Sequence, residues 1–200
     1  MDKVCDPEFK TAALKEWAVA VQALAAGETI LLLRKGGIRE QRFVRPNAQP
    51  QFWLYPTYEH QKPHLLKASY ANQVTPVESG WHPETVELRA WAEITDGFEV
   101  QSESELEALL PYHIWNATFV TERLQWKPSL PLTALLLRVY LLPQPHVIPY
   151  CESYGGCKSW IDMPIAIELS PNPATPALAD AVYAERRQAI LRHHPTTIQH

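Results

Sequence analysis

The stretch ETVELRAWAEI, residues 84–94, decides the class of fold, because it alternates apolar and polar side chains. Its apolar positions are Val86, Leu88, Ala90, Ala92 and Ile94. Successive side chains of a strand point to opposite faces of a sheet, so these positions would all lie on one face. The alternation therefore predicts a strand with one face on the core and the other toward solvent.

Outward from this strand, further segments on both sides are typical of strands. They lie at residues 28–35, 38–45, 51–55, 132–142, 146–150 and 164–169. Gly27 stands before the first of them and Pro56 closes the third, and both residue types commonly mark the ends of regular elements. We therefore expect a sheet of several short to medium strands.

Helices are predicted near both ends of the chain and in one internal pair. Asp6-Pro7 offers a capping acid and a proline at the first helical position, which predicts a helix over residues 8–26 that buries Trp17. Ser102 and Glu105 form a capping box for a short helix that ends before Pro111, and a second short helix follows at 116–126. Thr175-Pro176 is expected to open a C-terminal helix that runs to about Leu191.

These elements define the expected fold class as α+β. Helices do not separate the strands regularly, so a doubly wound parallel sheet is not expected. We predict a mixed or antiparallel sheet, flanked by an N-terminal and a C-terminal helix, and its curling into a small barrel is left as an alternative. The 200 residues fit a single α+β domain over 1–170, with a C-terminal helix and tail appended over 171–200.

Two glycine doublets mark the first candidate site. The chain has only seven glycines, yet four of them form the pairs Gly36-Gly37 and Gly155-Gly156, each close to a lysine. Backbone amides in a glycine turn can form a concave nest for an anion, and a cation beside it adds charge. The candidate ligand-binding residues of these loops are Arg34, Lys35, Gly36, Gly37, Tyr154, Gly155, Gly156, Lys158, Ser159 and Trp160. Tight turns between strands are the alternative interpretation.

A third candidate segment is the loop after residues 51–55, which mixes rings and cations. Its candidate ligand-binding residues are Tyr58, His60, Gln61 and Lys62. Interleaved aromatic and cationic side chains are typical of surfaces that stack on nucleobases. His60 and His64 are four residues apart, but Pro63 interrupts the helix that would aim both at one metal ion. We therefore expect no metal and no cofactor.

Charge is unevenly distributed along a chain whose formal net charge is −4. Residues 34–67 carry seven lysines and arginines against two acids, whereas residues 78–107 carry nine acids against Arg89 alone. This asymmetry predicts one basic and one acidic face, unless both are simply solvated surfaces. The basic face fits a nucleic-acid partner and the acidic face a protein partner.

No targeting or membrane-spanning segment is expected. The first ten residues lack the apolar core of a signal peptide, and purely apolar runs such as residues 134–137 are far too short to span a bilayer. The three cysteines are Cys5, Cys151 and Cys157, an odd and widely spaced set that fits reduced thiols. A cytoplasmic location without membrane contact is therefore expected.

Five segments together resemble a known family. They are ALKEWAVAVQAL, LLLRKGGIRE, YPTYEHQKP, HIWN and YGGCKSW, which lie within residues 10–165. In these segments the chain resembles a bacterial family, frequent in cyanobacteria, that is known as domain-of-unknown-function family 1802. This resemblance implies no activity and no catalytic residues.

The order of elements is also similar, more weakly, to the PUA-like and ASCH barrels, which implies binding of RNA or modified bases or hydrolysis of modified nucleosides. The ASCH motif G-x-K-x-x-E is not met in order, because Glu28 follows Gly27 and Lys35 comes too late. No catalytic residue is therefore carried over from that likeness.

Three hypotheses for function follow. The first is a module that binds RNA, DNA or a nucleotide through Lys35, Lys62 and Lys158 on phosphate, with Tyr58, Tyr154 or Trp160 stacking on a base. The second is a small hydrolase acting on a modified nucleoside or nucleic acid, with Lys35 or His60 as the proton-transfer group. The third is a protein that binds a protein partner through the acidic segment 78–107.

Overall fold

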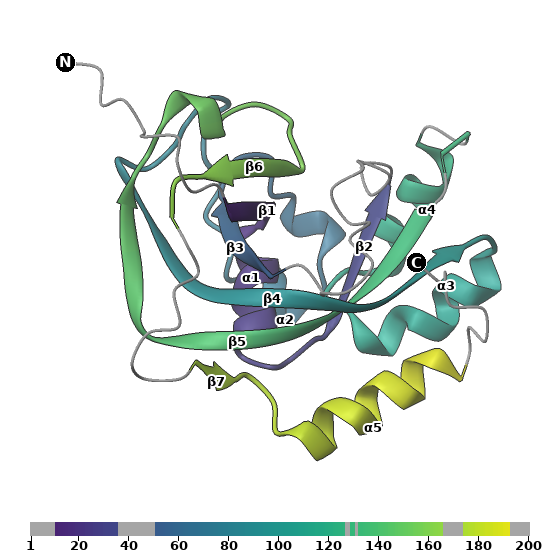
Figure 1. Ribbon diagram of the computed structural model, residues 1–200. Coiled ribbons are helices and arrows are strands. Elements are labelled where there is room, and N and C mark those ends of the chain that lie inside the picture. Colours follow the sequence, from purple (N-terminus) through teal and green to yellow (C-terminus); the bar gives the residue numbers. More distant parts are fainter. Residues whose placement is uncertain (1–10, 36–50, 127–128, 131, 166–173, 193–200) are drawn as a thin grey trace.

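A mixed sheet of seven strands, curled into a half-barrel, organises the protein (Figure 1). The computed structural model describes residues 11–35, 51–126, 129–130, 132–165 and 174–192. The strands are β1 (Thr11–Trp17), β2 (Leu31–Lys35), β3 (Phe52–Thr57), β4 (Thr85–Val100), β5 (Leu132–Pro149), β6 (Trp160–Met163) and β7 (Thr175–Pro176). Their order is β2-β5-β4-β3-β1-β6, and β7 pairs with β5. Only β1 and β3 run parallel among these pairs.

Five α-helices accompany the sheet in the described part of the chain. They are α1 (Ala18–Ala25), α2 (Ala68–Ala71), α3 (Glu103–Leu109), α4 (Ala117–Gln125) and α5 (Asp180–Leu191). None of the described helices is long and apolar enough to cross a bilayer.

The helices and the mixed sheet together confirm the predicted α+β class, and the sheet is curled.

The sheet is buried on both of its faces. Along β3, Phe52 and Leu54 belong to the main core, whereas Trp53 and Tyr55 belong to a second core on the opposite face. Neighbouring side chains of a strand alternate between faces, so a strand buried on both sides reads as a continuous apolar run. This explains why FWLY looks so strongly apolar in the sequence.

The long strand β4 departs from the prediction that its apolar side chains share one face. The register with β5 shifts between Leu88 and Ala90. Leu88 consequently packs in the second core, while Ala90 and Ala92 pack in the main core. This irregularity reverses the alternation of side chains beyond it, so the prediction of a single apolar face for this segment is wrong.

The N-terminal helix is shorter than predicted. Residues 11–17 form strand β1, and the helix α1 covers only residues 18–25. The segment TAALKEW is rich in helix formers, but it pairs with β3 on one side and β6 on the other, and this tertiary pairing outweighs local propensity. Trp17 lies half-buried at the strand end, edge-on to Phe119 at 6.4 Å between ring centroids.

Other boundaries also differ from the sequence predictions. The segments at 132–142 and 146–150 form one continuous strand, β5. Thr175 and Pro176 form the short strand β7, and the C-terminal helix begins only at Asp180. Three predicted segments lie wholly or partly outside the described residues. They are the strand at 38–45, most of the strand at 164–169, and residues 8–10 of the N-terminal helix.

The capping box predicted for the first internal helix is confirmed. The Ser102 side chain accepts a hydrogen bond from the Glu105 amide, and the Glu105 carboxylate accepts one from the Ser102 amide. Asn116 likewise accepts a hydrogen bond from the amide of Phe119 at the start of α4. Because each cap satisfies backbone donors that would otherwise lack partners, these helix starts can be predicted from local sequence.

Candidate functional site

A cleft of about 470 Å³ opens beside the ends of β1 and β2, against α4 and the loop before β6. We call it the large cleft. Its charged lining comprises five cations, Lys15, Arg34, Lys35, Arg123 and Lys158, against two acids, Glu16 and Glu59. Four aromatic residues, Trp17, Trp115, Phe119 and Trp126, also line it. An excess of positive charge beside rings suits an anionic ligand that carries flat groups.

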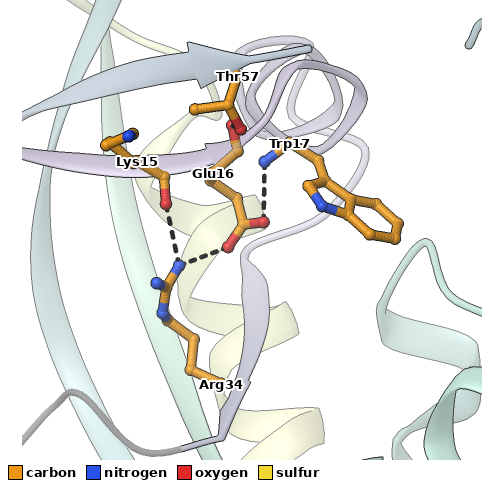
Figure 2. A network of polar contacts seen from close by, with 5 residues as sticks. All are labelled: Lys15, Glu16, Trp17, Arg34 and Thr57. Carbon is orange, nitrogen blue, oxygen red and sulfur yellow. Dashed lines mark hydrogen bonds and ion pairs between the residues drawn. The ribbon is translucent and has the colours of Figure 1, made fainter. Parts of the chain in front are cut away.

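Arg34 is neutralised within the protein (Figure 2). Arg34 donates through Nη1 to Glu16 Oε2 at 2.6 Å and to the carbonyl oxygen of Lys15 at 3.2 Å. Glu16 Oε1 accepts from the Trp17 amide at 2.9 Å, and Thr57 Oγ1 donates to the Glu16 carbonyl at 3.0 Å. This network ties together β1, β2 and β3 and points the Trp17 ring away from the ion pair. Arg34 thus has a structural role here.

Lys15 holds the second glycine loop in place. Its Nζ donates to the carbonyl oxygens of Tyr154 at 2.5 Å and Gly156 at 2.8 Å. Burial lowers the pKa of Lys15; Lys158 also lowers it, while Cys157 and Glu59 raise it. Two carbonyl acceptors therefore keep this ammonium fixed beneath the loop.

The loop itself depends on its glycines. A Cβ on Gly155 would lie 2.8 Å from Tyr150 Oη, which is too close for a side chain. Gly156 has a φ of 76°, in the left-handed region where other residues are strained. This backbone brings Gly156 and Lys158 to the large cleft.

Lys35, at the end of β2, and Lys158, in the loop before β6, line the same cleft although they lie far apart in sequence. The sequence predicts a single site for these two lysines, and both of them line this cleft. Their neighbours Gly36 and Gly37 lie outside the described residues. Burial first, and then the charge of Arg123, lowers the pKa of Lys35. The cations of the cleft thus repel one another, and a bound anion would relieve that repulsion.

An arginine covers the aromatic wall of the large cleft. The Arg123 guanidinium lies over the rings of Phe119 and Trp126, at 5.1 Å and 5.3 Å from their centroids. Burial is the main cause that lowers the pKa of Arg123; Glu16 raises it and Arg34 lowers it. Trp126 is 46% exposed, so part of its ring is accessible from the cleft.

The predicted residues of the loop after β3 separate into different environments. His60 lines the large cleft and adopts a left-handed φ of 63°, with Nε2 3.1 Å from Glu59 Oε1. Tyr58 lines a neighbouring smaller cleft. Gln61 Oε1 accepts from the Val19 amide at 3.0 Å and so caps α1. Lys62 is exposed and is not part of the lining of either cleft.

Two of the rings predicted to stack lie in the interior. Tyr154 is 4% exposed and Trp160 is 8% exposed. Tyr154 packs edge-on against Tyr55, and Trp160 packs edge-on against Phe52. Ser159 lines the large cleft, and its carbonyl oxygen accepts from the Lys15 amide.

Several residues that line the large cleft were not predicted as site residues from the sequence. Lys15 and Trp17 were assigned to a helix, and the strand β1 is what turns them toward the cleft. Arg123 and Trp126 stand three residues apart at the end of α4, a spacing that places side chains on the same side of a helix. This spacing, together with Phe119, was the sequence signal that these residues share one surface.

The acidic segment 78–107 has several internal roles. Asp96 is buried and binds Arg187 of α5 through two hydrogen bonds of 2.6 Å. Glu93 accepts from the Gln51 side chain, and Glu105 caps α3. Within the described ranges, no group of three or more metal-ligating side chains is close enough to hold a metal ion.

The fold and the cleft together define a class of protein: a single-sheet α+β half-barrel with a cation-rich, ring-lined cleft at one end of its sheet. Within that class, the chain belongs to the family described as "Domain of unknown function (DUF1802)", whose model matches residues 13–189. The match confirms the family resemblance of the sequence and extends it into α5.

Solved structures give a more distant likeness. The ASCH protein from Zymomonas mobilis is 15% identical, with a TM-score of 0.40 over 95% of this chain and 97% of that chain. A point mutant of the same protein is 15% identical, with a TM-score of 0.43 over 94% of this chain and 98% of that chain. The comparison with curated proteins gives no match.

Proposed function

We propose that the large cleft binds a single-stranded nucleic acid or a nucleotide. One observation carries this proposal: five cations, two acids and the at least partly exposed rings of Trp17 and Trp126 line a single cleft of about 470 Å³. Phosphates require cations, and stacking on bases requires accessible rings. A surface that merely kept the protein in solution would need neither the rings nor the excess of one sign.

The roles within the cleft are assigned from the position and charge of each side chain. Glu16 neutralises Arg34, and two carbonyls hold Lys15, so these two cations position the walls. Lys35, Arg123 and Lys158 supply charge for phosphate. Trp126, with nearly half of its surface exposed, offers a ring for stacking.

The test is a titration of fluorescently labelled single-stranded RNA and DNA at two or more salt concentrations. We expect the parent protein to bind at low salt and to weaken as salt rises, because phosphate contacts release counterions. Lys35→Ala and Lys158→Ala should each weaken binding and lower the slope of log K against log salt by about 0.7.

Arg89→Ala is the matched control, since this exposed arginine lies on β4 outside the cleft and pairs with Glu87. It should leave both affinity and slope unchanged. Absence of binding by the parent at low salt would refute the proposal, and equal effects of all three substitutions would move the binding surface elsewhere.

A second candidate function, hydrolysis of a modified nucleoside or nucleic acid, is favoured by the geometry of His60. A left-handed backbone at a residue other than glycine is uncommon and often occurs at functional sites, and this residue lines the cleft beside Glu59. Incubating the protein with modified nucleosides and with labelled RNA would reveal products. His60→Asn, which tolerates the same backbone, should abolish any such turnover without unfolding the protein.

A further inference from the structure

A second cleft, of about 130 Å³, adjoins the large one. The two clefts share four lining residues, Lys15, Thr57, Glu59 and Gly156. Beyond this shared rim the lining of the second cleft is dominated by rings: Tyr55, Tyr58, Trp81, His82, Tyr150 and Tyr154. We call it the aromatic cleft. The change of lining across one rim, from cations to rings, indicates two subsites for one ligand.

The aromatic cleft is poorly suited to a phosphate. Its charged lining residues among those described are Lys15 and Glu59, both on the shared rim. The Lys15 ammonium already donates to two carbonyl oxygens. The Glu59 carboxylate repels anions, and hydrogen bonds from the Gly80 amide and then Ser79 hold its pKa below the ordinary value. A flat neutral group meets none of these obstacles.

Two exposed rings of the aromatic cleft, Trp81 and Tyr58, are held in place. Trp81 is 45% exposed and Tyr58 is 36% exposed, and they meet edge-to-face with centroids 5.9 Å apart. Glu59 Oε1 accepts from the Gly80 amide at 2.7 Å and from Ser79 Oγ at 3.1 Å, which fixes the backbone next to Trp81. Two further rings of this cleft are also stacked, since His82 lies on Tyr150 with 3.5 Å between the ring centroids. Rings that are already ordered lose little freedom when a ligand stacks on them.

We propose that the aromatic cleft receives a nucleobase of the same ligand whose phosphates occupy the large cleft, with the rim at Lys15 and Thr57 between the two. This inference rests on the proposed function and assigns to it a base-binding subsite. Trp81 and Tyr58 supply the stacking surface. The hydroxyl of Tyr55, whose pKa burial raises, stays protonated and is available as a hydrogen-bond donor.

The experiment compares two labelled oligonucleotides of equal length, one with bases and one in which every sugar is abasic. Both carry the same phosphates, so only base contacts distinguish them. We expect the parent to bind the base-bearing strand at least tenfold more tightly, in line with stacking on one or two rings. Trp81→Ala should reduce that ratio about tenfold while leaving the salt slope unchanged.

Trp81→Phe is the matched control, because it keeps a ring at the same position and should preserve most of the ratio. Lys35→Ala should show the opposite pattern, with a lower salt slope and an unchanged ratio. Melting curves of each variant check that the fold is intact, which is expected because Trp81 is so exposed.

The outcomes separate the two proposals. If the parent binds both strands equally, or if Trp81→Ala leaves the ratio unchanged, the base subsite is wrong while the phosphate cleft stands. If the parent binds neither strand at low salt, the proposed function is wrong and the subsite falls with it.

Discussion

Cations are used differently at the large cleft and at the junction between β4, β5 and α5. At the junction each arginine meets an acceptor: Arg187 binds Asp96, Arg138 pairs with Asp180, and Arg186 donates to the carbonyl oxygen of Gly27. At the cleft, cations outnumber acids by five to two. Matched charges fasten one element to another, whereas an excess of one sign leaves charge that a bound ligand of the other sign can neutralise.

The two regions also differ in how much each would cost to disturb. The Asp96 side chain is only 2% exposed, and each of its carboxylate oxygens accepts a hydrogen bond from the Arg187 guanidinium. Lys158 of the cleft is exposed to solvent. Substitutions at the junction should therefore change the free energy of unfolding, and substitutions at the cleft should change binding.

The largest effect is expected for Arg187→Met. It leaves the buried Asp96 carboxylate without its cation, and breaking such a pair costs roughly 3–5 kcal/mol. Urea unfolding monitored by tryptophan fluorescence measures this cost. The variant should bind oligonucleotides like the parent at a temperature where both are folded, and a selective loss of binding would contradict the division between the two regions.

The next effect concerns pH and the buried His113. Burial first, and then the charge of Lys67, lowers the pKa of this histidine from 6.5 to about 4. Between these values the unfolded chain binds a proton that the folded protein excludes, so stability is present near neutral pH and is lost as pH falls. The loss amounts to about 3 kcal/mol from this group.

His113→Leu removes this titrating group and should flatten the dependence on acid. Unfolding free energies of parent and variant at pH 7 and pH 4.5 give the comparison, because the carboxylates contribute equally to both. A parallel loss in the two proteins would show that His113 is protonated in the folded state.

Local structure could be predicted from the sequence where contacts within a short segment determine it. Ser102 and Glu105 cap their helix through contacts three residues apart, so the helix start could be predicted. β1 could not be predicted, because its Ala, Leu, Lys and Glu favour a helix and only the pairing with β3 and β6 makes it a strand. The irregularity of β4 near Arg89 could not be predicted for the same reason, since it depends on the register with β5.

The same limit applies to the candidate site. Lys35 and Lys158 stood out because scarce glycines lie beside them, and they line one cleft. Lys15 was overlooked because its direction depends on β1 being a strand. The spacing of Arg123 and Trp126 places them on one side of the chain at the end of α4, but only the tertiary fold shows that this side faces the loop before β6.

A smaller effect, of opposite sign, is expected for Glu16→Gln. The amide keeps an oxygen that can accept from the Trp17 amide but no longer neutralises Arg34. The cleft gains one net positive charge, so binding of oligonucleotides should strengthen by about 1 kcal/mol or less and the salt slope should steepen. Glu87→Gln, on an exposed acid of β4, is the control and should change neither quantity. Weaker binding by Glu16→Gln would show that the network of Figure 2 matters for shape more than for charge.

The smallest effect is expected for Lys62→Ala. The sequence predicts a phosphate contact for this lysine, but it is exposed and lines neither cleft, so any such contact lies at the edge of the bound strand. An exposed lysine contributes little to stability, and the melting temperature should therefore stay that of the parent. In the same salt titration, the reduction in slope should be smaller than the reduction of about 0.7 expected for Lys35→Ala. An equal reduction would extend the phosphate path from the large cleft across the loop after β3. Because Lys35 and Lys62 differ mainly in whether they line the cleft, the ratio of their effects measures how far the cleft confines the ligand.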